Sequence, residues 1–194
     1  MEGPRLAADD LACRRGERVL FAGLSLALES GQACHVTGPN GTGKSSLIRI
    51  LAGLLRPFAG RVTRSGSLGL VDERLALDEH MPLGRALAFW ERLDGCGDNA
   101  RALESMQLTD LLDVPVRYLS TGQRKRAALA RLLNGGRQVW LLDEPFNGLD
   151  AEARQGLEAR IGVHCGGGGI ALVASHQPIA LPDVTTLHLP EHAA

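Results

Sequence analysis

The sequence has 194 residues, which is enough for one domain that buries most of its apolar surface. Its net charge is −1, so no overall field attracts nucleic acid or anionic lipid, and no nucleic-acid partner is expected. Its longest apolar runs fall far below the roughly 20 residues of a membrane-spanning helix. The cysteines are scattered, and free thiols are expected at Cys13, Cys34, Cys96 and Cys165.

Short apolar runs in the first third of the chain are bounded by glycine or polar turns, which is typical of β-strands. These runs cover residues 24–28, 33–37 and 61–63. Between the second and third runs, leucines recur at helical spacing, at Leu47, Leu51 and Leu54. Residues 44–55 are therefore predicted to form a helix that Pro57 and Gly60 terminate.

The middle of the chain, residues 83–134, is predicted to be almost wholly helical because its apolar residues form stripes at helical spacing. One stripe consists of Leu83, Leu87 and Trp90, and a second contains Leu103 and Met106. The last third alternates again, and its predicted elements are a strand at 139–143, a helix at 151–164 and strands at 170–175 and 186–189.

Strands that alternate with helices predict an α/β fold with a mainly parallel core sheet. The strands of the first third predict a β subdomain at the N-terminus. No linker-like composition flanks the helical middle, so it is predicted to be a subdomain, residues 76–134, inserted into a single domain spanning residues 1–194.

The predicted strand at 33–37 leads into a glycine-rich loop. Its residues are Gly38, Pro39, Asn40, Gly41, Thr42, Gly43, Lys44 and Ser45, and they satisfy the pattern G-x-x-x-x-G-K-[ST] in full. Backbone N–H groups of such a loop cradle phosphates, the lysine reaches the β- and γ-phosphates, and the serine hydroxyl binds Mg²⁺. The flanking strand and helix disfavour the alternative, a turn that binds nothing. The loop, extended by Ser46, predicts a P-loop NTPase.

An apolar strand at 139–143 ends in two neighbouring acids, Asp143 and Glu144. The carboxyl ends of strands in α/β folds face the ligand crevice, so both acids are expected there. Asp143 is predicted to hold Mg²⁺ through water, and Glu144 to polarise the water that attacks the phosphate. Taken alone, the two acids are equally consistent with a solvated strand end.

The segment from Leu119 to Gln123 opens a long predicted helix, with Ser120 as its N-cap. Its free N–H groups and the positive end of the helix dipole can bind a phosphate, although an ordinary capping turn is the alternative. The basic residues that follow, Arg124, Lys125 and Arg126, are interpreted as a solvated face rather than as phosphate ligands.

His176 follows the predicted strand at 170–175, 32 residues after Glu144 (176 − 144). A histidine at this strand end can bond the γ-phosphate or the attacking water. His35, His164, His188 and His192 have no comparable context and are assigned no role.

Five short motifs stand in the order found in ABC ATPases, and together they resemble that family over nearly the whole chain. They are the loop at 38–45, Leu-Ser-Thr-Gly-Gln at 119–123, Leu-Leu-Asp-Glu-Pro at 141–145, Gly-Leu-Asp at 148–150 and Ser-His at 175–176. The resemblance implies that two copies pair head to tail and sandwich ATP. Ser120 and Gly122, together with Gln123, then act on the ATP of the other copy, and Asp150 communicates across the interface.

The sequence departs from the family pattern at three positions. Thr121 stands at a position of the signature motif where the family usually has glycine. No Tyr or Phe stands where the family stacks an aromatic ring on adenine, so Arg15 is predicted to stack its guanidinium there instead. The usual glutamine after the next strand is absent, and Glu73 is expected to face Mg²⁺ at that position.

Several segments carry a finer resemblance, among them Arg15–Phe21, Leu51–Pro57, Val139–Phe146 and His176-Gln177-Pro178. These segments resemble the ATP-binding subunits of the bacterial cytochrome c maturation transporter. That family is described as exporting heme or as energising release of the heme-loaded periplasmic chaperone. The resemblance implies ATP and Mg²⁺ as cofactors, a separate membrane-spanning permease subunit (CcmB-like) as partner, and a peripheral location on the cytoplasmic face of the bacterial inner membrane.

The sequence is also consistent, to different degrees, with two alternative functions. The chain is also consistent with the ATPase of another small exporter, of a drug or a lipid for example, because the membrane partner selects the cargo. A soluble ABC ATPase of DNA repair or translation is less consistent, since only 76 residues separate Lys44 from Ser120 (120 − 44). The helical middle is expected to dock the permease, while Phe89, Trp90 and Leu93 are interpreted as its core.

Overall fold

The computed structural model describes residues 3–74, 76–95 and 100–193. Its centre is a five-stranded sheet in which every neighbouring pair of strands is parallel. In spatial order the strands are β5 (Leu68–Val71), β6 (Val139–Asp143), β7 (Ile170–Ala174), β3 (Ala33–Thr37) and β8 (Val184–His188). The prediction of an α/β fold with a mainly parallel sheet is confirmed.

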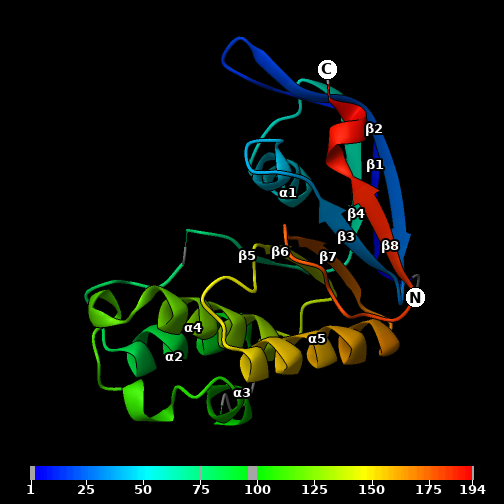
Figure 1. Cartoon of the computed structure of the whole chain (residues 1–194). Coiled ribbons are helices and arrows are strands. Elements are labelled where there is room, and N and C mark those ends of the chain that lie inside the picture. The colour runs from blue at the N-terminus through cyan, green and yellow to red at the C-terminus, as the bar shows by residue number, and fades with distance from the viewer. Residues whose placement is uncertain (1–2, 75, 96–99, 194) are drawn as a thin grey trace.

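A smaller antiparallel sheet is formed by the N-terminal strands. Its spatial order is β2 (Arg18–Glu29), β1 (Arg5–Arg15) and β4 (Ala59–Ser65), and Figure 1 shows it lying beside the parallel sheet. β1 was not predicted from the sequence. Asp9 and Asp10 interrupt its apolar pattern, and the pairing with β2 shifts register after Ala8, so the period of two on which strand prediction depends is broken.

Helices cover both faces of the parallel sheet (Figure 1). The α-helices are α1 (Lys44–Ala52), α2 (Leu83–Asp94), α3 (Ala100–Ser105), α4 (Thr121–Asn134) and α5 (Ala151–Gly166). Short 3₁₀ turns occur at Thr109–Leu111 (η1), Val116–Tyr118 (η2) and Leu189–His192 (η3). The predicted helical middle is thus divided into separate helices, because Gly95 ends α2 in a left-handed conformation (φ 65°) and Pro115 is extended before η2.

Two hydrophobic clusters lie on opposite faces of the sheet, and alternation along each strand explains how one strand serves both. In β6, Val139 and Leu141 join α1 and the antiparallel sheet, whereas Trp140 and Leu142 join α2, α4 and α5. All the residues of β6 and β7 are buried, as expected for parallel strands covered on both sides.

The helix predicted for residues 44–55 is shorter than expected. α1 ends at Ala52, where Gly53 adopts a left-handed conformation (φ 79°) and its N–H caps the carbonyls of Arg49 and Ile50. Leu54 therefore leaves the buried stripe, and 67% of its surface is exposed. Leucine spacing alone does not predict this end of the helix, because Gly53 lies inside the periodic pattern.

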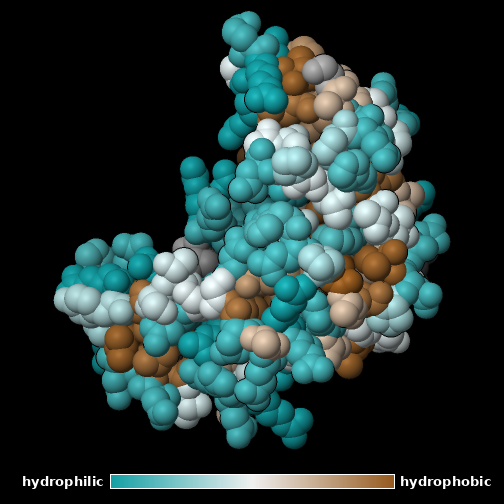
Figure 2. Space-filling view, in the orientation of Figure 1, coloured by the Kyte–Doolittle hydropathy of each residue, from teal (hydrophilic) through white to brown (hydrophobic). Residues whose placement is uncertain are grey.

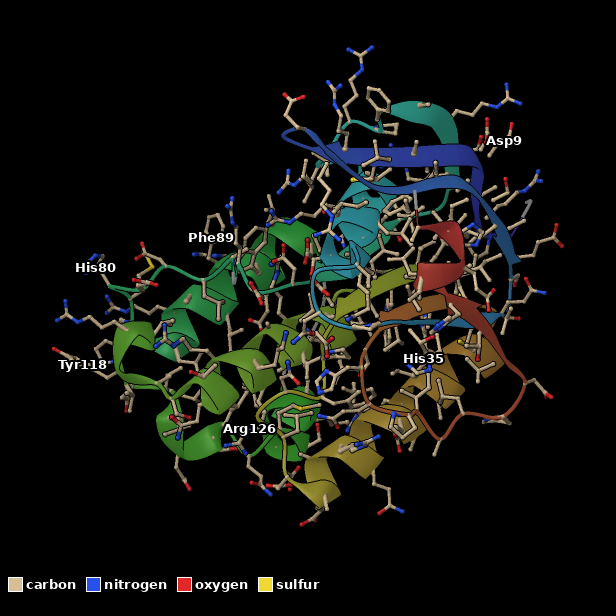
Figure 3. All side chains as sticks on the ribbon, turned by 45° about the horizontal axis from the view of Figure 1, so that its top comes forward. Asp9, His35, His80, Phe89, Tyr118 and Arg126 are labelled. Atoms are coloured by element: carbon tan, nitrogen blue, oxygen red, sulfur yellow. The ribbon has the colours of Figure 1, made fainter. Side chains whose placement is uncertain are left out.

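The interpretation of Phe89 and Leu93 of α2 as core residues is wrong. Phe89 is 50% exposed and Leu93 is 64% exposed, so neither belongs to the core, while Trp90 is partly buried under the guanidinium of Arg131. Figure 3 places Phe89 on the helical part of the molecule, on the opposite side from His35 in the sheet. Figure 2 shows an apolar patch over this helical part at the lower left.

The sequence predicts no membrane-spanning helix and free thiols at its cysteines. In the part of the chain that the structure describes, none of the helices combines the length and the apolar character that crossing a bilayer requires. Cys13, Cys34 and Cys165 are free and buried, whereas Cys96 lies outside the described residues.

Candidate nucleotide site

The glycine-rich loop connects β3 to α1 in the way the sequence predicts. Gly43 has φ 108°, and a Cβ atom there would stand 3.1 Å from the ring of Phe21, so the position requires glycine both for its backbone and for its space. Pro39, Asn40, Gly41 and Ser45 are exposed, while Gly38 and Thr42 are half-buried. The loop thus presents backbone N–H groups and the first turn of a helix to one surface.

Lys44 folds back over this loop and is only 6% exposed. Its Nζ donates to the carbonyl oxygens of Gly38 at 2.7 Å and Pro39 at 3.2 Å. The same Nζ lies 3.6 Å from Oε1 of Glu144. An ammonium group is therefore buried between the loop and a catalytic candidate, at the place where a phosphate is expected to bind.

The topology of the sheet explains why distant parts of the chain meet here. β7 lies between β3 and β6, and Ala174 of β7 is level with Val36 of β3 and with Asp143 of β6. The segments that leave these three strands therefore start at the same edge of the sheet. The structure brings the loop at 38–45, the Asp143-Glu144 pair and His176 together, as the sequence predicts.

Asp143 is nearly inaccessible, with 2% of its surface exposed. Burial raises the pKa of its carboxyl group, although a hydrogen bond from Ser45 and the charge of Lys125 act in the opposite direction. Among the described residues, its Oδ1 is buried without a hydrogen-bond partner. An unpartnered carboxylate oxygen beside the Ser45 hydroxyl is the oxygen-rich environment that Mg²⁺ prefers.

Glu144 is held in an unusual conformation. Its φ is 45°, in the left-handed region that is costly for a residue with a side chain. Its backbone N–H donates to the carbonyl of Ala174 at 2.8 Å, and its Oε2 lies 2.9 Å from Nδ1 of His176. Because both of its carboxylate oxygens face cationic or polar groups, the side chain is fixed at the centre of the site.

The predicted signature segment starts α4. The Ser120 hydroxyl accepts from the N–H of Gln123 at 3.2 Å, and the Gln123 side chain accepts from the N–H of Ser120 at 2.8 Å, which is a complete capping box. Gly122 packs directly on the loop after β6, because a Cβ atom there would lie 2.5 Å from the carbonyl oxygen of Gly148. The capping turn and the helix start are confirmed.

The basic residues that follow are not a uniform solvated face, and for Lys125 that interpretation is wrong. Lys125 is 8% exposed, and its Nζ donates to the backbone carbonyl of Asp143 at 3.0 Å. Burial lowers the pKa of its ammonium group, and nearby carboxylates, first Asp143, oppose that shift. Sequence reasoning missed this residue, although the scarcity of lysine was a signal: the chain has two lysines, Lys44 and Lys125, and 19 arginines.

Three further predicted residues are placed less centrally. Arg15 is exposed at the end of β1, where it pairs with Arg18 across the turn. Ser46 is half-buried on α1, and its hydroxyl bonds the thiol of Cys13. Glu73 is exposed in the bend after β5, while its neighbour Asp72 is buried and accepts from Arg49 at 3.0 Å.

The contact of Gly122 with Gly148 leads to a prediction about stability. Gly122→Ala is expected to lower the free energy of unfolding by about 1–3 kcal/mol, because the added methyl group must push two backbone segments apart. Gly156→Ala is the matched control, since a methyl group there meets open space on α5 and should stabilise the helix by about 0.5–1 kcal/mol. Urea unfolding measures both, and a Gly122→Ala variant as stable as the original chain would contradict the contact.

Comparison with known proteins supports nucleotide chemistry at this edge of the parallel sheet. The sequence pattern of the family described as ABC transporter matches residues 21–147. A cytochrome c biogenesis ATP-binding export protein CcmA of Novosphingobium aromaticivorans is 59% identical over 182 residues, which are 94% of either chain. A protein of the same name from Sphingopyxis alaskensis is 54% identical, over 94% of this chain and 95% of the other.

A solved structure agrees in fold. A Pyrococcus furiosus protein described as an ABC transporter ATP-binding protein superposes with a TM-score of 0.84 at 21% identity, over 98% of this chain and 100% of that one. The family match covers more than half of the chain and includes the loop, Ser120, Asp143 and Glu144. The chain therefore belongs to the ABC transporter family, as an ATP-binding and ATP-hydrolysing subunit, and within it to the family of cytochrome c biogenesis ATP-binding export proteins named CcmA.

Proposed function

We propose that this chain hydrolyses ATP to energise the cytochrome c maturation system, on the cytoplasmic face of the bacterial inner membrane, together with a separate CcmB-like permease. The observation that carries the proposal is the meeting of the phosphate-binding loop, Asp143, Glu144 and His176 at adjacent strand ends. The high identity to the CcmA proteins supports the choice of this system over another small exporter.

In the proposed reaction, the loop at 38–45 binds the phosphates, and the Lys44 ammonium, which lies at the Gly38 and Pro39 carbonyls of that loop, contacts the β- and γ-phosphates. Glu144 orients and polarises the attacking water. His176, bonded to Glu144, holds that carboxylate and reaches toward the γ-phosphate. The hydrolysis step therefore depends on residues from three strands.

Ser45 and Asp143 are proposed to hold Mg²⁺. The fit rests on the buried, unpartnered Oδ1 of Asp143 and on the oxygen chemistry of the two side chains. When bound, Mg²⁺ supplies positive charge that neutralises the phosphate oxygens. Glu73 is proposed to face this cluster from the bend after β5, since Val71 at the end of β5 is level with Leu142, next to Asp143 in β6.

A second copy of the chain is proposed to complete the site. Ser120, Gly122 and Gln123 lie at the N-terminus of a 14-residue helix, whose free N–H groups and dipole favour a phosphate. These residues then act on the ATP that the other copy binds. Arg15 is proposed to stack on adenine, because it is exposed at the end of β1 and no aromatic side chain stands at this position. Ser46 is proposed to bind ATP together with the loop, from the first turn of α1.

The permease is proposed to dock on the helical subdomain at about residues 76–134 and on the groove beside it. This groove has a volume of about 530 Å³ and opens along β5, the edge strand of the parallel sheet. Its walls come from α1, β5 and α4, and they include Arg49, Leu54, Leu70, Asp72 and Arg131. Leu54, 67% exposed, gives the groove an apolar rim that supports a protein contact.

The test has two parts. The purified chain is expected to hydrolyse ATP, and the chain expressed with its CcmB-like permease is expected to be recovered bound to it from detergent-solubilised membranes. Leu54→Ser should lower that recovery about tenfold, which corresponds to about 1.4 kcal/mol of lost contact. Val163→Ser, at an apolar residue 77% exposed on α5, is the control and should leave recovery unchanged.

Two results would count against the proposal. Absence of ATP hydrolysis would remove the enzymatic part. Stable recovery with an unrelated permease, but not with the cytochrome c maturation permease, would overturn the assignment to that system.

A further inference from the structure

The two lysines of the chain, Lys44 and Lys125, are both buried, and both hydrogen-bond at the same strand edge. Arginine supplies every other permanent side-chain cation. Lys44 is accounted for by phosphate binding. Lys125 instead bonds the backbone of Asp143, so its burial requires a separate explanation, because an ammonium group leaves water at a high cost unless it is compensated.

The compensation comes from one peptide group and from the surrounding charge. Nζ of Lys125 donates to the carbonyl oxygen of Asp143 at 3.0 Å. Four carboxylates, those of Asp143, Asp72, Glu73 and Glu144, favour its positive charge. The carbonyl of Asp143 belongs to the same planar peptide group as the N–H of Glu144.

That peptide group is held from both sides. Its N–H donates to the carbonyl of Ala174 at 2.8 Å, and its C=O accepts from Lys125 at 3.0 Å. The next backbone torsion is φ of Glu144, which is 45°. A left-handed conformation of a residue with a side chain persists only when its surroundings over-determine it. A peptide plane clamped at both ends meets that requirement.

Resting on the proposed function, we propose that Lys125 is a positioning residue: from α4 it clamps the Asp143–Glu144 peptide and so holds Glu144 in the geometry that ATP hydrolysis needs. ATP binding does not need this clamp. Because α4 also carries the Ser120 segment, the clamp links the position of that helix to the position of Glu144.

A purely structural role of Lys125 would predict a different result of its substitution. If Lys125 only filled space, Lys125→Met would preserve activity, since the apolar stem would still lie beside the buried Leu129, one turn further along α4. With the clamp, Lys125→Met lowers kcat by roughly 10- to 100-fold, the usual effect of removing a group that orients a reactive side chain. KM for ATP changes by no more than about twofold.

The experiment uses the full chain and measures steady-state ATP hydrolysis. Lys125→Gln is the conservative variant, since its amide can still donate to the Asp143 carbonyl, and it should recover part of the lost kcat. Arg126→Met is the matched control on the same helix, because that guanidinium bonds Gln107 instead of the site. Its kcat should equal that of the original chain.

A double substitution separates positioning from general damage. Glu144→Gln already removes the group that Lys125 is proposed to position, so adding Lys125→Met should lower the rate little further. The proposal would be overturned if Lys125→Met lowered kcat of the Glu144→Gln chain by the same factor by which it lowers kcat of the original chain. An unchanged kcat in Lys125→Met, or a rise in KM that matches the fall in kcat, would also overturn it.

A measurement on the unmodified chain covers the case in which Lys125→Met does not fold. Lysine labelled with ¹⁵N at Nζ gives two ammonium NMR signals, because the chain has two lysines. The Lys125 signal, assigned with Lys125→Gln, is expected to exchange slowly with and without ATP. Exchange as fast as that of free lysine would overturn the proposal, whereas failure of the original chain to hydrolyse ATP would instead overturn the proposed function.

Discussion

Lys44→Ala is expected to weaken ATP binding by roughly 100-fold, because truncating one partner of a buried charged contact costs about 2–5 kcal/mol. The Lys44 ammonium lies over the loop, bonded to the Gly38 carbonyl at 2.7 Å, and it is therefore close to the backbone N–H groups that are proposed to bind the phosphates. Titration of a fluorescent ATP analogue measures the change directly.

The control for this prediction is Arg56→Ala, which removes an exposed cation beyond α1 and should leave ATP affinity unchanged. The thermal unfolding midpoints of both variants show whether the fold is intact. Lys44→Ala also removes the cation 3.6 Å from Glu144, so a small loss of stability is compatible with the interpretation. Unchanged ATP affinity in a folded Lys44→Ala chain would contradict the phosphate-binding role.

Glu144→Gln is expected to lower ATP hydrolysis by about 10²- to 10⁴-fold while ATP binding is retained. The amide has almost the shape of the carboxylate, and it can keep the contact with Nδ1 of His176, which measures 2.9 Å in the original chain. It cannot accept a proton from the attacking water. Removal of its negative charge also releases Lys44 for the phosphates, so ATP affinity should stay equal or increase.

Because hydrolysis normally ends the ATP-bound state, the Glu144→Gln chain should accumulate as an ATP-bound pair of copies. Size-exclusion chromatography with ATP and Mg²⁺ is expected to show a dimer that is absent without ATP. Glu104→Gln, at an exposed acid on α3, is the matched control and should hydrolyse ATP at the original rate. Turnover by Glu144→Gln at the original rate would refute the assignment of Glu144.

The elements that sequence reasoning located well are those whose signal is local. β3 and β6 have the predicted limits, and α1 starts at Lys44, because apolar runs, a glycine pattern and a helix start are all read within about ten residues. β5 was not located from its apolar pattern, since four residues with a glycine among them give too short a signal, and only the family resemblance implied a strand just before Glu73. Gly53 ended α1 inside a leucine repeat that favoured continuation.

The candidate site shows the same division between local and long-range information. Lys44, Asp143, Glu144 and His176 were identified from their motifs, and they meet at one sheet edge. The burial of Lys125 was not predictable from its neighbours, since Arg124 and Arg126 on either side are only half-buried. Its partner lies 18 residues away along the chain, at the end of a strand.

The amino-acid sequence by itself determined the chemistry of this protein: a phosphate-binding loop, a strand ending in two acids and a histidine after another strand. The tertiary structure decided their arrangement, by placing β7 between β3 and β6 so that three loops start at one edge. It also decided that Lys125 is buried and that Glu144 has a left-handed backbone. The physical reason is that a side chain's identity is local, whereas its desolvation and its hydrogen-bond partners depend on segments that only folding brings together.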